Sequence, residues 1–489
     1  MAINLVWLKR DIRLADHQPI QQAIANSIAE QSPLVLLYIF EEMLLNDPHY
    51  STRHWRFVYQ SLLDVARQLP EKALWITHGN AIDVIDEIHK HFQINTIYSH
   101  EEIGLENTYI RDQQVSAWCQ QHQISWQQSQ LGAVQRGLIN RVNWDKHWAD
   151  VMRAPIQATS FAQVTLIPPD NNLLACDSNK VNEQWLDIDE NFQLGGESQA
   201  MIVANSFFAE RGKSYSFSLS SPSLSRAYCS RLSPYLAWGN ISLRQVYQTL
   251  LAHWQKPGWR RSLSALSSRL HWHCHFIQKF ESEHRIEHEA INRGYENMPR
   301  DNSEAAQVKL SAWKTGNTGY PMVDACMRCL LRSGYVNFRM RAMLVSFLSH
   351  HLHLDWRLGV QYLASLFLDF EPGIHYSQFQ MQAGITGINT IRVYNPVKQS
   401  QEKDTEGAFI KAWLPELAHI PAPIIHEPWL MTEMEQMMYG LKLGQDYPLP
   451  IVDIKSTGKQ ARELLWQWRN KAQVKQESYR ILARHVRPD

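Results

Sequence analysis

The fold is decided by a stretch in the C-terminal half that opens with residues 313–328, WKTGNTGYPMVDACMR. Further along come NFRMR at 337–341, DWR at 355–357, FLDFE at 367–371 and YNP at 394–396. In this stretch acids and arginines recur among aromatic residues, within segments that otherwise have the pattern of buried helices. Buried charges are costly unless they are paired. The pattern therefore indicates that a helical domain holds a polar ligand in its interior.

Helical patterns continue on both sides of this stretch. Apolar residues spaced by three and four positions predict helices over 243–254, 263–288, 321–333, 340–351 and 357–368, and one amphipathic helix with a basic face over 457–485. We therefore expect residues 224–489 to form an all-helical domain.

The beginning of the chain has a different sequence pattern. Apolar runs predict buried parallel strands at 3–8, 34–40, 73–76 and 96–98, and helical patterns at 53–68 and 81–91 alternate with them. This predicts an α/β domain with a doubly wound parallel sheet over residues 1–130. The turn at 9–14, KRDIRL, lacks the Gly-x-Gly-x-x-Gly of dinucleotide-binding domains. Residues 131–223, rich in Pro, Asn, Asp, Gly and Ser after position 165, are predicted to be an interdomain connector.

Composition limits the class of protein. A chain of 489 residues is too long for one ordinary core, and its net charge of zero means that any nucleic-acid surface must be a local patch. Six cysteines indicate a reducing compartment, so we expect a cytoplasmic protein. No apolar run approaches the roughly 18 residues that cross a bilayer. The 18 tryptophans fit either core packing, which composition alone favours, or an aromatic network around a redox or light-absorbing cofactor.

Several polar groups are candidate site residues, each with a structural alternative. Arg341 and Asp369 lie in apolar helical surroundings, where they form either a structural ion pair or a grip on the polar edge of a heterocycle. The segment 229–236, CSRLSPYL, forms either an anion-binding site at the start of a helix or an ordinary helix N-cap. Cations mixed with aromatics at 256–261 and 328–341 suit nucleic acid or a solvated surface. The histidines and cysteines lack metal-ligand spacing, so no metal site is predicted.

Four motifs, taken together and in order over nearly the whole chain, resemble the photolyase/cryptochrome family. They are VWLKRDIRLADH at 6–17, SRLSPYL at 230–236, the block at 313–328, and YNP at 394–396 followed by Gly407 and WLPEL at 413–417. The resemblance implies an N-terminal α/β antenna domain and a C-terminal helical domain that holds FAD. Because no cysteine follows Cys329, the chain resembles a divergent bacterial-type branch without the iron–sulfur cysteines, and no metal cluster is expected.

The resemblance also implies the site residues. FAD would be bound by Tyr215, Cys229, Ser230, Arg231, Leu232, Ser233, Trp272, Phe338, Arg341, Asp369, Phe370, Glu371 and His375. Arg341 and Asp369 would flank the isoalloxazine ring, and His375 would face flavin N5, where it could donate a hydrogen bond and titrate near neutral pH. Trp356, His375 and Trp272 would act in the light reaction. The DNA lesion would meet Arg269, Trp272, Phe338, Arg339 and Met381.

The chain departs from the family at functional positions. Of the three tryptophans that commonly carry an electron to photoexcited flavin, Trp356 is kept, whereas Phe379 and Ser303 stand at the flavin-proximal and outer positions. Tyr335, Tyr376, Trp313 and Trp272 remain as alternative routes. Where cyclobutane-dimer photolyases carry Glu, Asn, Met and a second Trp, this chain has Arg269, Phe338, Ala342 and Met381. Phe338 and Ala342 also replace the two histidines of (6-4) photolyases, so that chemistry is not predicted.

The function implied is that of a light-driven FAD flavoprotein. We predict a monomeric deoxyribodipyrimidine photolyase-type lyase that repairs pyrimidine dimers in UV-damaged DNA by electron transfer from reduced flavin. The alternatives are a cryptochrome-like blue-light photoreceptor without repair activity and a flavoprotein without a light-driven function; the lack of a long C-terminal tail favours repair. A second antenna chromophore, a folate, deazaflavin or flavin, is expected in the N-terminal domain. His100, Glu101 and Glu102 are candidate contacts for it, or an ordinary loop with an acid pair.

Overall fold

A five-stranded parallel sheet forms the N-terminal part of the computed structural model, which describes residues 2–170, 173–174 and 182–486. The strands are β1 (Ile3–Leu8), β2 (Leu34–Glu41), β3 (Trp75–Gly79), β4 (Ile94–His100) and β5 (Ser125–Ser129). Their order is β3-β2-β1-β4-β5, so the chain winds outward from β1 first to one side and then to the other. The predicted doubly wound α/β architecture is confirmed.

Helices cover both faces of the sheet, which explains the unbroken apolar strands. Ile3, Leu5 and Trp7 point into a core shared with α4 (Ala81–Phe92) and α5 (Glu106–Gln121). Val6 and Leu8 point to the opposite face, into a larger core that contains α1 (Gln18–Glu30) and continues into the helical domain. A strand buried on both faces loses the alternation of apolar and polar residues.

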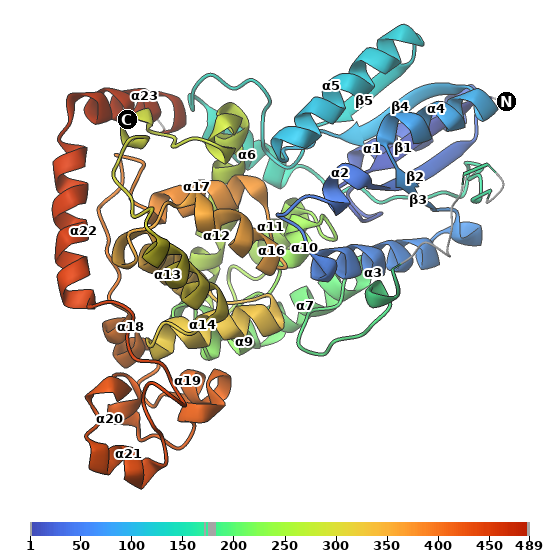
Figure 1. Ribbon diagram of the computed structural model, residues 1–489. Coiled ribbons are helices and arrows are strands. Elements are labelled where there is room, and N and C mark those ends of the chain that lie inside the picture. The colour runs from blue at the N-terminus through green and yellow to red at the C-terminus, as the bar shows by residue number, and fades with distance from the viewer. Residues whose placement is uncertain (1, 171–172, 175–181, 487–489) are drawn as a thin grey trace.

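The rest of the chain is mainly helical, as predicted (Figure 1). The remaining α-helices are α2 (Glu42–Leu45), α3 (Thr52–Gln68), α6 (Trp144–Arg153), α7 (Glu197–Ala209), α8 (Tyr215–Ser218), α9 (Leu224–Tyr228), α10 (Ser233–Ala237), α11 (Leu243–Ala252), α12 (Arg260–Ser282), α13 (Glu304–Thr315), α14 (Pro321–Ser333), α15 (Phe338–Ser346), α16 (Arg357–Leu366), α17 (Pro372–Gln382), α18 (Pro396–Lys403), α19 (Ala408–Trp413), α20 (Ala422–Ile425), α21 (Glu433–Tyr439), α22 (Ile454–Arg469) and α23 (Ala472–His485). Helices α6, α7 and α8 lie in the segment predicted as a connector; the domain boundaries stay predictions. Within the described ranges, no helix has the length and apolar character needed to span a membrane.

The stretch 313–328 contains the end of α13, a tight connection at 316–320 and the first part of α14. Gly316 ends α13 in the left-handed conformation (φ 68°), and Pro321 opens α14, where its missing N–H has no cost. Asp324 is fully buried and accepts hydrogen bonds from the Thr318 N–H (2.8 Å) and hydroxyl (2.6 Å) and from the Tyr447 hydroxyl (2.6 Å). The Asp324 carboxylate therefore stabilises the connection between α13 and α14.

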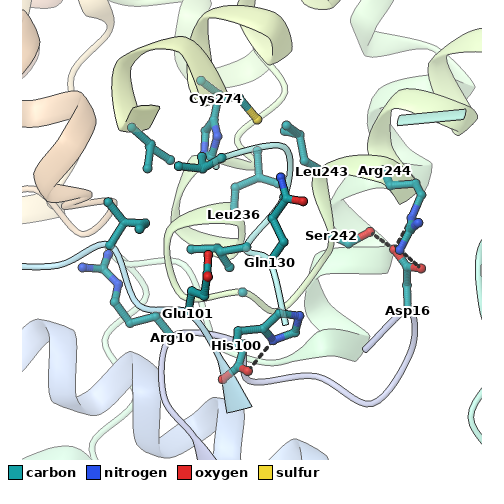
Figure 2. A pocket seen from close by; sticks show the side chains of 18 of the residues that line it. Arg10, Asp16, His100, Glu101, Gln130, Leu236, Ser242, Leu243, Arg244 and Cys274 are labelled. Carbon is teal, nitrogen blue, oxygen red and sulfur yellow. Dashed lines mark hydrogen bonds and ion pairs between the residues drawn. The ribbon is translucent and has the colours of Figure 1, made fainter. Parts of the chain in front are cut away.

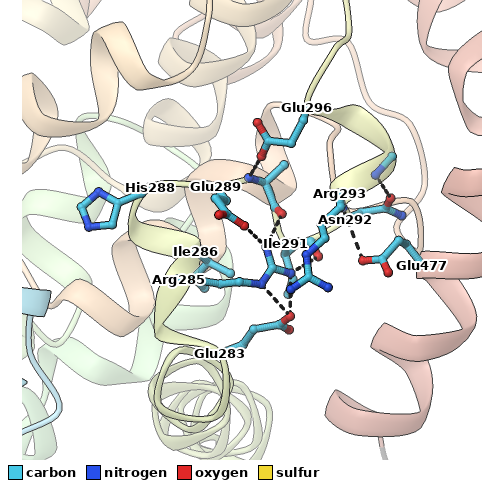
Figure 3. A network of polar contacts seen from close by, with 12 residues as sticks. Glu283, Arg285, Ile286, His288, Glu289, Ile291, Asn292, Arg293, Glu296 and Glu477 are labelled. Atoms are coloured by element: carbon cyan, nitrogen blue, oxygen red, sulfur yellow. Dashed lines mark hydrogen bonds and ion pairs between the residues drawn. The ribbon is translucent and has the colours of Figure 1, made fainter.

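The single helix predicted over 457–485 is wrong, because the chain turns between α22 and α23. The break comes at Lys471, whose backbone is extended (φ −63°, ψ 142°). Just before it, the Trp468 indole N–H donates to the Gly294 carbonyl at 2.7 Å. The turn brings α23 back to the loop around Glu283, which lies in the polar network of Figure 3. These contacts are distant in sequence, so no local pattern marks the break.

Candidate functional site

A pocket lies in the helical domain between α15, the loop 367–371 and α17; we call it the helical pocket. Six of the predicted site residues line it: Phe338, Arg341, Asp369, Phe370, Glu371 and His375. Most of the remaining wall is apolar or aromatic, with Phe367 and Phe379 among its rings. A pocket of apolar walls with a few convergent polar groups is the usual form of a cofactor site.

Arg341 and Asp369 form a two-pronged ion pair in the wall of the helical pocket. The two guanidinium nitrogens Nη1 and Nη2 each lie 2.9 Å from one carboxylate oxygen. Burial by itself raises the pKa of Asp369, but the guanidinium and the Ser233 hydroxyl outweigh burial and lower that pKa. The carboxylate therefore stays ionised, and its unused lone pairs can accept from ring N–H groups of a guest.

The segment 229–233 meets this ion pair, so two sets of predicted residues converge. Ser233 hydrogen-bonds to Asp369, and the Arg231 guanidinium stacks on the Tyr335 ring at 3.5 Å. Arg231 Nη1 is buried and, among the described residues, has no hydrogen-bond partner. Burial raises the pKa of the Cys229 thiol to about 11. An unpartnered buried guanidinium N–H beside hydroxyl groups fits the phosphate oxygens of a dinucleotide.

The other residues predicted to bind the phosphates lie close by. Tyr215 is buried within electrostatic reach of Cys229, and Leu232 is buried directly before α10. The Ser230 hydroxyl accepts the Leu232 N–H at 3.5 Å, and Arg211 donates to the Ser230 carbonyl at 2.9 Å. The hydroxyl and guanidinium groups of the segment thus fit the phosphate oxygens of FAD.

His375 lies on α17 with its ring in the pocket wall. Its Nε2 is 2.8 Å from the Val360 carbonyl. A carbonyl oxygen only accepts, so the ring proton is on Nε2 and Nδ1 carries a lone pair. Burial lowers the pKa of His375 to about 3. The expectation that it titrates near neutral pH and donates a hydrogen bond is therefore wrong: the free nitrogen of this neutral ring accepts.

The predicted lesion residues do not gather in the helical pocket. Of the five, only Phe338 lines it within the described structure; Arg269, Trp272, Arg339 and Met381 do not. Phe338 is 52% exposed and forms the pocket rim. Trp272 is 48% exposed on α12, where it stacks on Phe276 with ring centroids 5.3 Å apart. Its free face is available for stacking on a base.

The predicted electron-transfer position Trp356 is buried beside the pocket. Its ring centroid lies 6.4 Å from Phe379 and 6.3 Å from Tyr376. Ser303 is an exposed residue at the start of α13 and bonds to Asp301 at 2.6 Å. The aromatic path from the pocket through Trp356 therefore continues to Tyr376 and not to the outer position that Ser303 occupies.

Sequence reasoning missed the two residues behind Tyr376. The Tyr376 hydroxyl lies 2.6 Å from His49 Nε2, and His49 Nδ1 lies 2.6 Å from an Asp47 carboxylate oxygen. His49 and Tyr376 are 327 positions apart in the chain. No spacing rule connects residues so distant, so the sequence carried no signal for this group.

A second hollow, which we call the boundary cavity, lies between the carboxyl ends of the strands and the helical domain (Figure 2). It encloses about 220 Å³ and is lined by Lys9, Arg10, His100 and Glu101, among others. Lys9 Nζ and Arg10 Nη1 are buried, and neither has a hydrogen-bond partner in the described chain. Glu371 lines both this cavity and the helical pocket, so the two hollows lie back to back.

Asp11, His17 and His100 cluster beside the boundary cavity, with their ligand-type atoms within 4.8 Å of one another. His17 Nδ1 accepts the Ile20 N–H at 3.3 Å, which places the ring proton on Nε2, 3.0 Å from the Asp11 carboxylate. His100 Nδ1 lies 2.6 Å from the same carboxylate oxygen. Burial raises the pKa of Asp11, yet the imidazoles outweigh it and hold the pKa well below its usual range. The close contacts of two imidazoles with one ionised carboxylate account for this cluster.

Two family models match the chain. Residues 4–136 match the DNA photolyase model, and residues 265–467 match the FAD binding domain of DNA photolyase. The first match covers the α/β sheet, and the second contains the whole helical pocket. Together they span more than half of the chain.

Relatives match over nearly the full length. Cryptochrome DASH of Synechocystis sp. is 28% identical over 94% of this chain and 97% of its own length. The deoxyribodipyrimidine photo-lyase of Alkalihalophilus pseudofirmus is also 28% identical, with the same coverage. The crystal structure of the Synechocystis cryptochrome superposes with a TM-score of 0.80 at 26% identity, over 95% of this chain and 99% of that one. On its sequence, its sheet and helical pocket, and these matches, the chain belongs to the photolyase/cryptochrome family.

Proposed function

We propose that this protein is a light-driven FAD-dependent DNA photolyase that splits pyrimidine dimers by electron transfer from reduced flavin. The observation that carries the proposal is the helical pocket, where the paired Arg341 and Asp369 meet Ser233 and the unpartnered Arg231 inside aromatic walls. When bound there, FAD would supply the light absorption and the one-electron chemistry.

The chain's own residues would bind and orient the two molecules. Asp369 and Arg341 would hold the polar edge of the flavin ring, and Arg231 would donate to phosphate oxygens. Phe338 at the rim separates the pocket from solvent. A flipped pyrimidine dimer would approach over this rim, with the exposed face of Trp272 available for stacking.

A local cationic surface supports DNA binding on a chain without net charge. Arg260 and Arg261 are exposed at the start of α12, and their guanidinium groups lie over the rings of Trp254 (4.3 Å) and Phe217 (4.5 Å). Cations held on aromatic faces are oriented for phosphate contact. We expect the affinity of this protein for DNA to fall steeply as salt rises.

The test uses purified protein with chemically reduced FAD, blue light and an oligonucleotide that contains a defined cyclobutane dimer. Loss of the dimer in the light and not in the dark supports repair. The same incubation with Asp369→Asn should show weakened FAD retention and proportionally less repair. Protein that holds FAD but leaves the dimer intact under light would remove the photolyase proposal.

The alternative function is a blue-light photoreceptor of the cryptochrome type. Two observations favour it: Arg269, Trp272 and Met381 lie outside the helical pocket, and Phe379 and Ser303 interrupt the usual tryptophan path. A photoreceptor would change its flavin redox state in light and bind damaged and undamaged DNA equally. Paired binding measurements on the two oligonucleotides distinguish the functions.

A second chromophore would occupy the boundary cavity. Lys9 Nζ lies 3.5 Å from an Asp112 carboxylate oxygen, and Arg10 Nη2 lies 3.2 Å from one of Glu371. Lys9 Nζ and Arg10 Nη1 still make no hydrogen bond in the described chain, and both would find acceptors on an anionic or carbonyl-rich pigment. The His100–Glu102 loop lines this cavity, where its acids could contact such a pigment. Extraction of pigment from the purified protein, followed by its absorption spectrum, tests the proposal. Arg10→Ala should lower the amount of the second pigment bound per protein. In this variant the FAD content should remain higher than the content of the second pigment.

A further inference from the structure

Tyr376 is a buried tyrosine with an unusual hydrogen-bonding partner. It lies on α17, 1% exposed, and its hydroxyl is 2.6 Å from His49 Nε2. His49 Nδ1 is in turn 2.6 Å from Asp47 Oδ1. Asp47 also accepts the His49 backbone N–H at 2.9 Å and the Asn107 side-chain amide at 2.8 Å. The result is a continuous tyrosine–histidine–aspartate line inside the protein.

The direction of each hydrogen bond follows from these partners. Asp47 receives three donors, as an ionised carboxylate does, so His49 donates from Nδ1. In the neutral form of this ring, Nε2 then carries a lone pair and accepts the Tyr376 O–H. Burial raises the pKa of Tyr376 well above its usual value, so the phenol keeps its proton until an electron leaves it. His49 is therefore a base that faces a phenolic proton.

Tyr376 is also placed on the route to the helical pocket. Its ring centroid lies 5.9 Å from His375, which lines the pocket, and 6.3 Å from Trp356. The Arg357 guanidinium lies 4.8 Å above the Trp356 ring. A cation in that position disfavours a positive charge on the indole. Oxidation of Tyr376 meets no such penalty, because its proton can pass to the imidazole at the same time.

We propose that Tyr376 is the proton-coupled electron donor of this protein, in place of the missing tryptophan path. The proposal rests on the FAD binding of the proposed function: photoexcited oxidised flavin would be the electron acceptor, and the step would lead towards the reduced flavin that repair requires. Tyr376 loses one electron to the flavin, its O–H bond breaks, and a new N–H bond forms at His49 Nε2. Tyr376 becomes a neutral phenoxyl radical, and the imidazolium is paired with Asp47. Tyr376 and His49 are the reacting residues; Asp47 is a positioning residue.

Two half-buried tyrosines of the helical domain, Tyr362 and Tyr335, lack this arrangement. Tyr362 donates its hydroxyl to the Lys314 carbonyl at 2.7 Å, which cannot take a proton. Tyr335 lies under the guanidinium groups of Arg231 (3.5 Å) and Arg341 (6.0 Å), which oppose its oxidation. Tyr376 is therefore the member of this group with a base in hydrogen-bond contact.

The test follows light-driven reduction of the flavin in the full-length FAD-bound protein, by absorption and by electron paramagnetic resonance. Tyr376→Phe removes one hydroxyl from a buried ring and should slow reduction roughly hundredfold, the scale of lost general-base assistance. The tyrosyl radical signal should disappear with it. Tyr362→Phe is the matched control and should reduce at the rate of the wild type.

A second variant separates chemistry from folding. His49→Gln keeps a hydrogen-bonding side chain but removes the base, so reduction should again slow while FAD content is kept. Reduction of the wild type should be slower in D2O, and this isotope effect should change in His49→Gln, which a purely structural role would not cause. FAD-bound Tyr376→Phe that photoreduces like the wild type overturns the assignment of Tyr376 alone. Wild-type protein that binds no FAD overturns the proposed function.

Discussion

Two histidines contact the Phe370 ring, and they differ in the partner of one nitrogen. His49 stacks on Phe370 with centroids 5.6 Å apart, and His375 meets it edge-on at 5.3 Å. His49 has a carboxylate partner, Asp47, at 2.6 Å. His375 has a backbone carbonyl partner, that of Val360, at 2.8 Å.

This difference assigns the two rings different chemistry. A carbonyl carries no charge, so His375 remains a neutral ring whose burial lowers its pKa to about 3. A carboxylate stabilises an imidazolium, so His49 can receive a proton from Tyr376. The lesson is that the second nitrogen decides whether a buried histidine is an acceptor only or a base.

The largest effect is expected when the carboxylate behind His49 is removed. Asp47→Asn makes the partner neutral, as it is for His375, and allows the new amide to donate to Nδ1 so that the ring proton moves to Nε2. Light-driven flavin reduction should slow roughly hundredfold, since a wrong tautomer disables a histidine base. The rate is measured on FAD-bound protein under blue light. Asp83→Asn on the exposed face of α4 is the control, and equal rates for the two variants would contradict the tautomer argument.

The acid sensitivity of the fold should report the neutral state of His375. Its pKa is about 3 when folded and 6.5 ordinarily, so below pH 6.5 the unfolded chain binds a proton that the folded chain does not. Its contribution to stability is therefore complete above pH 6.5 and is lost as pH falls towards 3, by at most about 1.4 kcal/mol per pH unit. His375→Gln should flatten the fall of the melting temperature between pH 6.5 and 5. At pH 8 His375 is neutral in both the folded and the unfolded chain. The difference in melting temperature between wild type and His375→Gln at this pH therefore measures the destabilisation that the substitution itself causes. Parallel pH curves would show that His375 has the same pKa in the folded and the unfolded chain.

Much of the fold could be predicted because its signals are local. The strand Ile3–Leu8 is an unbroken apolar run, and the helix Pro321–Ser333 is bounded by a proline at its first position and by Gly334 after its last. The edge strand β5 was missed because its sequence, SWQQS, is polar and half exposed. The turn after Trp468 was missed because it depends on the distant Gly294.

The candidate site divides in the same way. The pairing of Arg341 with Asp369 could be predicted, because two opposite charges in apolar helices require each other, and the structure confirms that contact. Its role in binding flavin stays a prediction. The bond between His49 and Tyr376 joins a loop beside the sheet to α17, and chemistry that arises from such folding contacts has no sequence pattern.

A smaller effect is expected on the redox balance of the flavin when His375 loses its lone pair. Reduced flavin carries an N–H at ring position N5, whereas oxidised flavin has only an acceptor there, so the Nδ1 of His375 would favour the reduced state. His375→Leu should shift the balance towards oxidised flavin by about 1.5 kcal/mol, the scale of one buried hydrogen bond. A spectroelectrochemical titration of the bound flavin measures the shift as a more negative midpoint potential. A more positive potential would mean that the ring presents an N–H to the flavin.

The smallest effect is expected when the side chain of Phe370 is shortened. Phe370 is 1% exposed and contacts both imidazoles, so Phe370→Leu loses ring contacts while keeping most of the buried volume. The free energy of unfolding should fall by about 1 kcal/mol, as for other near-isosteric core changes. Phe217→Leu, at a ring that is 69% exposed, is the control and should leave the melting temperature unchanged. Because Phe370 contacts the two histidines without hydrogen-bonding to either, the rate of flavin photoreduction should change less than in Asp47→Asn. A rate loss as large as that of Asp47→Asn would show that the two histidines act as one coupled group rather than as an acceptor and a base.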